Sequence, residues 1–128
     1  MITLRNISIV FKTVLICGAF LFARHSVGAE VAGELLESID SGKKLYTANC
    51  TLCHGTTGQG DGRMAKVITE PPPADFTKSK RSKAYMKKMV TYGGEVMGRS
   101  PQMPVWGQEL NEKQVQAVVD YVFSLRAN

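Results

Sequence analysis

The five residues Cys50-Thr51-Leu52-Cys53-His54 constrain the fold of this 128-residue chain more than any other stretch. They form the pattern C-x-x-C-H, whose spacing brings two thiols within reach of the two vinyl groups of one porphyrin. The neighbouring imidazole is then placed under the iron, where it can bind as the proximal ligand. We therefore expect one covalently bound haem c, attached through Cys50 and Cys53, with His54 on the iron.

Three other roles for this motif agree less well with the sequence. A disulfide between Cys50 and Cys53 would leave His54 without a role. A thioredoxin-type redox pair usually lies in a βαβ setting, and no segment of this chain alternates like a strand for long. A zinc site would need a fourth ligand, and the chain has no further Cys or His after residue 29.

The second axial ligand of the iron is expected to be a methionine. His54 is the only histidine after residue 29, so two imidazole ligands are excluded there, and Met is the expected partner. Met103 precedes Pro104, which favours a stiff, extended backbone suited to an iron ligand. Met97, in the same stretch rich in Gly and Pro, is the alternative. The remaining methionines fit core packing or lie too close behind the motif: Met64, Met86 and Met89.

The first 29 residues have the composition of a secretory signal peptide. Two basic residues precede an apolar run over residues 13–23, and small residues at 27–29 provide a cleavage site. The run is too short for a spanning helix, which needs about 20 residues, and an uncleaved anchor is the alternative. We expect export, with the bacterial periplasm as the location and no stable membrane span after cleavage. The third cysteine, Cys17, lies in this leader.

Helix and loop signals predict an all-α domain over residues 40–128, preceded by a polar lead-in over residues 30–39. The first helix is expected to begin at Asp40 or Ser41, either of which can cap free N–H groups. The expected elements are helices over about 40–53, 82–92 and from Asn111 onward, with a short turn around 64–68. Gly93 suits a helix stop, and Asn111 with Gln114 forms a capping-box pattern.

Two Gly- and Pro-rich loops, over residues 55–73 and 93–110, separate the expected helices. Loops of this length are uncommon in a small domain unless they have a function. A large apolar cofactor would fill the space that they surround. The expected fold therefore has three to five short helices, with long loops wrapped around one covalent haem, and the haem-free chain is expected to be largely unfolded.

These features together resemble a class I c-type cytochrome with one haem and a Met axial ligand. The resemblance covers residues 40–126 and is carried by Gly42 and Tyr46, CTLCHG at 50–55, GQGDG at 58–62, PPPADF at 71–76, YGG at 92–94, QMPVW at 102–106 and VVDYV at 118–122. It implies the cytochrome c fold, in which the first and last helices cross beside the haem. Gly42 would allow the close approach there, and Tyr121 would pack at the crossing.

The resemblance also implies two features of the haem site. A proline carbonyl, from Pro72 or Pro73, would accept the N–H of the His54 imidazole, which fixes the ring and raises its basicity. Met103 would occupy the position of the Met ligand.

A haem with both axial positions filled by protein leaves no vacant site for a substrate. This arrangement favours electron transfer and a protein that is not itself an enzyme. The leading hypothesis is a periplasmic shuttle that carries single electrons between redox partners. The alternative is a haem c subunit of a larger periplasmic or membrane redox enzyme. A gas-binding or sensor haem would require Met103 to be absent from the iron.

Basic residues are concentrated between Phe76 and Gly94, where the chain has no Asp or Glu. These residues, the basic stretch below, are Lys78, Lys80, Arg81, Lys83, Lys87 and Lys88. They could form a solvated helix face, or a docking surface for an acidic redox donor or acceptor. A nucleic-acid partner is not expected, because much of the net charge of +5 belongs to a leader that carries three basic residues and no acid.

Overall fold

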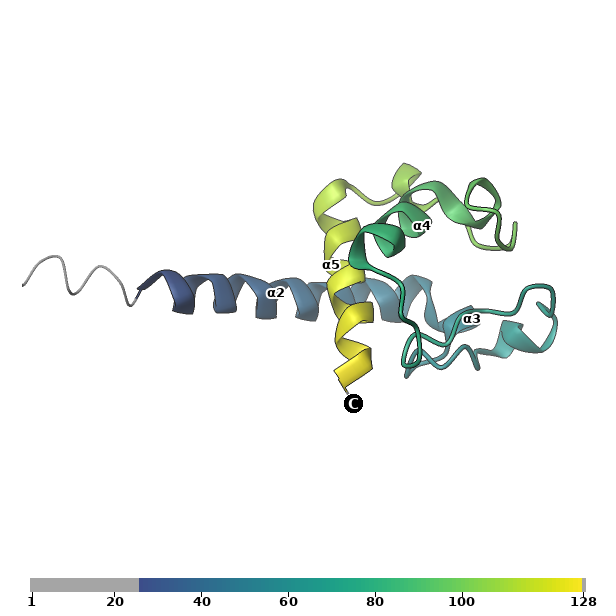
Figure 1. Cartoon of the computed structure of the whole chain (residues 1–128), viewed down its shortest axis with the longest axis horizontal. Helices are drawn as coiled ribbons and strands as arrows, with labels where there is room; N and C mark the ends of the chain where they lie inside the picture. Colours follow the sequence, from purple (N-terminus) through teal and green to yellow (C-terminus); the bar gives the residue numbers. More distant parts are fainter. Residues whose placement is uncertain (1–25, 128) are drawn as a thin grey trace, which may run out of the picture. The chain divides into compact units, whose positions relative to one another are not determined.

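The computed structural model describes residues 26–127, and every regular element in that part of the chain is helical (Figure 1). In chain order the elements are α2 (Ser26–Asn49), α3 (Thr51–His54), η1 (Arg63–Lys66), α4 (Lys83–Val96), η2 (Trp106–Gln108), α5 (Glu112–Ser124) and η3 (Leu125–Ala127), where η marks a 3-10 helix. The predicted all-α class is confirmed. Most of the predicted signal peptide, including Cys17, lies outside the described residues.

The chain divides between Glu34 and Leu35 into two compact units. The first contributes only the N-terminal part of α2 to the described residues, and the second contains all other elements. None of the helices within residues 26–127 combines the length and the apolar character needed to cross a bilayer.

Helix α2 begins at Ser26, so the prediction of a helix start at Asp40 or Ser41 is wrong, and residues 30–39 are helical. Both predicted capping residues lie inside the helix and bond to neighbours on it. Asp40 forms an ion pair of 2.8 Å with Lys44, and the Ser41 hydroxyl donates to the Ser38 carbonyl oxygen. The segment before them is rich in Ala, Glu and Leu, which are good helix formers, so nothing there ends the helix.

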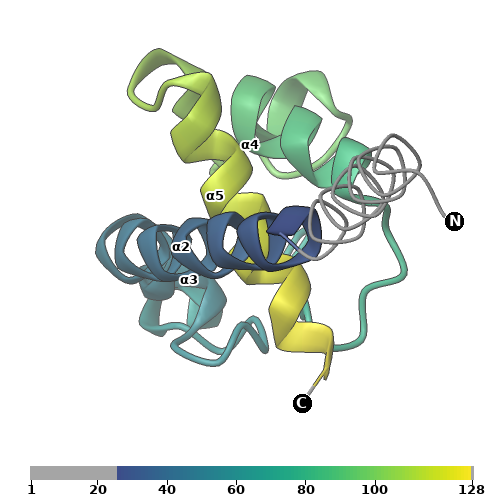
Figure 2. The same cartoon turned by 90° about the vertical axis from the view of Figure 1, so that its left-hand side faces the viewer.

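Helices α2 and α5 cross (Figure 2), and the contacts around Gly42 place this residue of α2 at the crossing. A Cβ atom at this position would overlap the carbonyl oxygen of Ala117 and would lie 3.0 Å from the Cβ atom of Tyr121. One turn further along α2, the ring of Tyr46 packs against the ring of Tyr121, with 5.2 Å between the centroids. The predicted crossing of the first and last helices, with Gly42 and Tyr121 at the contact, is confirmed.

Helices α4 and α5 begin as the sequence predicts. The Ser82 hydroxyl caps α4 by accepting the N–H of Tyr85 at 3.2 Å. Asn111 and Gln114 form both hydrogen bonds of the capping box at the start of α5. Inside α4, Gly93 has a φ of 79°, which favours glycine, and kinks the chain at the expected stop.

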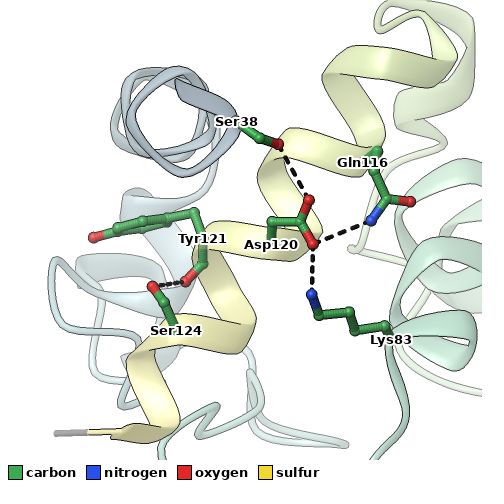
Figure 3. A network of polar contacts seen from close by, with 6 residues as sticks. All are labelled: Ser38, Lys83, Gln116, Asp120, Tyr121 and Ser124. Carbon is green, nitrogen blue, oxygen red and sulfur yellow. Dashed lines mark hydrogen bonds and ion pairs between the residues drawn. The ribbon is translucent and has the colours of Figure 1, made fainter. Parts of the chain in front are cut away.

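The core joins α5 to α2 and α4, and it contains the buried carboxylate of Asp120 (Figure 3). This carboxylate accepts hydrogen bonds from the Ser38 hydroxyl of α2 at 3.1 Å and from the Lys83 ammonium of α4 at 2.8 Å. A third hydrogen bond comes from the Gln116 amide at 3.2 Å. A buried charge is tolerated when it is paired and hydrogen-bonded, so Asp120 ties the three helices together.

Candidate functional site

The CxxCH residues occupy the turn and the short helix that follow α2. The N–H of Cys50 donates to the carbonyl oxygen of Tyr46 at 2.8 Å, so the motif is anchored to the last turn of α2. The N–H groups of Cys53 and His54 both donate to the carbonyl oxygen of Cys50, at 3.2 and 2.9 Å. Both thiols are free, and burial raises the pKa of the Cys50 thiol to about 12.

Glycines close the loop behind the motif. Gly55 has a φ of 77°, and a Cβ atom on it would overlap the carboxylate of Asp61. The carbonyl oxygen of Gly55 accepts a hydrogen bond of 2.7 Å from the buried hydroxyl of Tyr46. A Cβ atom on Gly62 would run into the backbone of Leu52, inside the motif. The loop therefore packs directly onto the CxxCH turn and fixes its conformation.

The imidazole of His54 is oriented by one hydrogen bond and one stacking contact. Its Nδ1 atom lies 3.3 Å from the carbonyl oxygen of Ala74, and its ring stacks on Phe76 at 4.5 Å. Because a carbonyl oxygen can only accept, this hydrogen bond places the proton on Nδ1 and leaves the lone pair of Nε2 for a metal. Burial lowers the pKa of His54, which favours the neutral ring that a metal requires.

The acceptor for His54 differs from the expectation. Neither Pro72 nor Pro73 supplies the carbonyl; Ala74, the first residue after the proline run, does so. The consecutive prolines restrict the backbone, and the contact with the ring is made one residue later.

A cavity of about 770 Å³ opens beside the motif, within the size range of small-molecule and cofactor pockets. Its lining is mostly apolar and comes from the end of α2, from α3, α4 and α5, and from the segments 68–81 and 99–106. Cys50, Cys53 and His54 all line it, and Met103 lines it from the loop that follows α4. The structure thus brings all four predicted site residues to one cavity, although they lie up to about 50 positions apart in the chain.

Met103 is held by the backbone at the end of α4. Its carbonyl oxygen accepts the N–H of Gly94 at 2.9 Å, and its own N–H donates to the carbonyl oxygen of Ser100 at 3.1 Å. A Cβ atom on Gly94 would lie 2.9 Å from the Cβ atom of Met103, and one on Gly93 would lie 3.0 Å from its carbonyl oxygen. The glycine pair therefore allows the Met103 segment to pack against the kink of α4.

The other methionines are placed differently. Met97 and Met64 are not among the cavity-lining residues. Met86 and Met89 line the cavity from α4, and Met86 is 7% exposed and belongs to the hydrophobic core. Among the two candidates from the sequence, the cavity geometry favours Met103 over Met97.

The comparison with protein families decides the class of this site. Residues 37–122 match the family model of the cytochrome c oxidase, cbb3-type, subunit III. The chain belongs to this family. It is a c-type cytochrome domain that binds haem c covalently and carries electrons, which confirms the resemblance to class I c-type cytochromes and the haem c prediction.

Curated relatives agree with this membership. The chain is 28% identical to the Cbb3-type cytochrome c oxidase subunit CcoP of Azospirillum brasilense over 98 residues, covering 67% of this chain and 28% of the relative. It is 27% identical to the subunit FixP of Azorhizobium caulinodans over 92 residues, covering 66% of this chain and 26% of the relative. The chain therefore spans about a quarter of the length of these relatives.

A solved structure shares the fold. A chain of the Kuenenia stuttgartiensis reducing HAO-like protein complex superposes with a TM-score of 0.57 at 30% identity. The match covers 70% of this chain and 44% of that chain. This likeness supports the cytochrome c fold of the cbb3-type domain.

The cavity of this cytochrome domain fits a haem by the chemistry of its lining. Two free thiols, one neutral imidazole with an open Nε2 and several thioethers, that of Met103 among them, converge on a mostly apolar space. Thiols can bond to vinyl groups, while imidazole and thioether are the axial donors of many cytochromes. The apolar lining matches the macrocycle, so the residues present suit the cofactor.

The basic stretch of the cytochrome domain is partly neutralised within the chain. Three of its lysines form ion pairs of 2.8–2.9 Å: Lys78 with Asp75, Lys83 with Asp120, and Lys87 with Glu112. Lys80 and Arg81 are exposed and line the cavity, as does Lys78. Lys88 is exposed and does not line it. The six residues therefore do not form one uniform surface.

Sequence reasoning missed several contributors to this cytochrome site. Phe76 against the His54 ring, the Ala74 carbonyl and the Tyr46 hydroxyl on Gly55 were not predicted. Phe76 and Ala74 belong to the PPPADF segment, so a role near the haem could have been read from that segment. The Tyr46 hydrogen bond has no local signal, because it joins a helix to the loop behind the motif.

Proposed function

We propose that Cys50 and Cys53 form the two thioether bonds to haem c, with His54 and Met103 as axial ligands of its iron. The convergence of these four side chains on one apolar cavity carries the proposal. In each attachment, the thiol sulfur forms a bond to a vinyl carbon and the thiol proton moves to the other vinyl carbon, so no oxidant is needed. When bound, the haem iron supplies a one-electron couple.

The chain's own residues would then set the properties of that couple. Ala74 holds the N–H of His54, which orients the ring and increases its basicity toward iron. Met103, fixed through Gly94, would occupy the other axial position and raise the reduction potential. With both positions filled by protein, no site for a substrate is left, so the domain itself transfers electrons without catalysing a reaction.

We further propose that the chain serves as a haem c subunit of a larger redox complex that faces the periplasm. The family membership and the relatives' identity as subunits of cbb3-type oxidases support this role over the free shuttle. The shuttle remains the second candidate. Redox donor and acceptor proteins are the expected partners in both cases, with docking at the exposed cations beside the cavity, Lys80 and Arg81.

The site proposal is tested by substitution of the axial candidates in the full chain, produced with haem attachment. Met103→Ala is expected to abolish the Met–iron absorption band of the ferric protein, whereas the matched variant Met97→Ala should keep it. Cys50→Ser and Cys53→Ser should each leave a single thioether, detected as haem that is still bound by mass spectrometry but altered in its reduced absorption maximum. A persistent Met–iron band in Met103→Ala would contradict the assignment.

The choice between subunit and shuttle is tested by isolating the protein from its source under mild detergent conditions. Co-migration of the haem c protein with a multi-subunit oxidase would support the subunit role. A monomer that reduces and oxidises separate partners at comparable rates would support the shuttle.

A further inference from the structure

Arg126, near the end of the chain, is the one described residue with a buried side-chain nitrogen that has no hydrogen-bond partner within residues 26–127. Its Nε atom is enclosed, while its guanidinium lies over the ring of Phe123, 4.3 Å from the centroid. Within the described residues no carboxylate forms an ion pair with Arg126. An enclosed polar atom without a partner within residues 26–127 has a free-energy cost, which the other contacts of this half-buried guanidinium have to offset.

The guanidinium reaches across to the segment that connects Phe76 to α4. Its Nη2 atom donates to the carbonyl oxygen of Arg81 at 2.6 Å, and it lies 3.5 Å from the Ser79 hydroxyl. It also contacts the sulfur of Met86 at 3.6 Å. Ser79, Arg81 and Met86 all line the cavity, whereas Arg126 itself does not.

Residues 79–81, which Arg126 contacts, lie along the chain between the two sets of residues that would hold the haem. Before it come Ala74 and Phe76, which orient His54. After it comes α4, whose kinked end holds Met103 through Gly94. A displacement of residues 79–81 would therefore loosen the wall of the cavity between the His54 side and the first turn of α4, which the Lys83–Asp120 pair also holds.

We propose that Arg126 is a positioning residue for the redox site, which clamps residues 79–81 to η3, directly after α5, and holds this wall of the cavity in place. It acts through the Arg81 carbonyl and does not contact the haem position. This inference rests on the proposed haem ligation by Met103. Loss of a charge-assisted hydrogen bond should raise the population of open cavities about tenfold, which is about 1.4 kcal/mol.

The test measures how often Met103 leaves the iron in the haem-loaded full chain. Carbon monoxide binds reduced haem only after the sixth ligand has left, so its binding rate reports opening. Arg126→Gln is expected to bind carbon monoxide about tenfold faster than wild type and to lose the ferric Met–iron band at lower denaturant concentration. Hydrogen exchange of residues 79–86 should also be faster.

The matched control is Arg99→Gln. Arg99 is exposed and, unlike Arg126, lines the cavity, and no side-chain hydrogen bond or ion pair of Arg99 is present within residues 26–127. Its substitution removes the same charge without removing a clamp. Both variants should lower the reduction potential, because a nearby positive charge favours reduced iron, but only Arg126→Gln should speed carbon monoxide binding.

Equal carbon monoxide rates in Arg126→Gln and Arg99→Gln would overturn the clamp. If Arg126→Gln does not accumulate, Arg126→Met decides, because it keeps an unbranched apolar stem but has no donor for the Arg81 carbonyl. A wild-type rate in Arg126→Met would overturn the proposal, and a faster rate would support it. Failure of the proposed function shows differently: the wild-type protein would then lack covalent haem or the Met–iron band.

Discussion

The hydroxyl of Tyr46 in α2 donates a hydrogen bond of 2.7 Å to the carbonyl oxygen of Gly55, the residue that follows His54. Tyr46 is 1% exposed, and its ring also contacts Tyr121 of α5 and Phe76, which stacks on His54. One side chain therefore joins the helix crossing to the loop that follows His54. Burial raises the pKa of Tyr46, so the phenol stays protonated and remains a donor.

Removing this hydroxyl tests the link. Tyr46→Phe leaves the Gly55 carbonyl without its partner and should lower the free energy of unfolding of the haem-loaded protein by about 1–3 kcal/mol. Denaturant titration followed by haem absorbance measures the change. Tyr121→Phe is the control, because the Tyr121 hydroxyl makes no hydrogen bond within the described residues, and it should stay close to wild type. Equal losses in both variants would contradict the role given to the Tyr46 hydroxyl.

Because of the helix crossing, a Gly→Ala substitution in α2 should change stability very differently at the crossing and away from it. Gly42→Ala should destabilise the protein by about 3 kcal/mol or more, because the new methyl group overlaps the Ala117 backbone and forces α2 and α5 apart. Gly33→Ala meets nothing within 4 Å and should be neutral or stabilising by about 0.5–1 kcal/mol, from helix propensity. Thermal unfolding of the two variants separates these outcomes, and a wild-type Tm for Gly42→Ala would refute the close packing.

The buried carboxylate of Asp120 should matter far more than an exposed one in a similar pair. Asp120→Asn weakens the contacts to Lys83 and Ser38 and should cost about 1–3 kcal/mol. Glu112→Gln removes the exposed pair with Lys87 and should change stability by less than about 1 kcal/mol. Denaturant midpoints at low and high salt check both values. Salt screens the exposed pair, so the stability difference between Glu112→Gln and wild type should shrink at high salt, whereas that of Asp120→Asn should persist.

Cations beside the cavity should control electron exchange with charged reagents. Lys80→Glu is expected to slow oxidation of the reduced protein by hexacyanoferrate(III), an anion, with the effect declining as ionic strength rises. Lys88→Glu has the same charge change on an exposed residue that does not line the cavity, and its effect should be smaller. Stopped-flow rates decide, and identical slowing in both variants would remove the docking role of Lys80. Lys83 is unsuited to this test because it also holds Asp120.

Haem removal should unfold the domain. A mostly apolar cavity of about 770 Å³ is a large void for so small a core, so the haem-free chain is expected to show no cooperative thermal transition. The thiols provide a second measure: in the unfolded chain Cys50 should titrate near the ordinary thiol value, since the burial that raises its pKa to about 12 is lost. Alkylation of Cys50 that begins only near pH 12 would show that the haem-free chain stays folded.

Much of this molecule follows from local patterns. The CxxCH motif, the capping box at Asn111 and the kink at Gly93 each depend on residues within a few positions of one another. Backbone geometry and capping chemistry act over such distances, so these features are readable from the chain alone. The same holds for the all-α class, whereas a methionine as the second ligand of the iron stays a prediction.

Other features required the folded chain. The first helix extends back to Ser26: Asp40 and Ser41 bond to neighbours on α2 instead of capping it, and Ser38 bonds to Asp120 of α5. Ala74, not a proline, meets His54, since the direction of the backbone after three prolines depends on packing against the ring.

The positions of the methionines and the cations relative to the cavity also depend on the folded chain. Met103 lines the cavity and Met97 does not, and Lys83 is committed to Asp120 while Lys80 lies at the cavity. These distinctions depend on partners tens of residues apart, which only the packing of α2, α4 and α5 brings together. The sequence determined which chemistry this protein can perform, and the tertiary structure decided which of several similar residues are positioned to perform it.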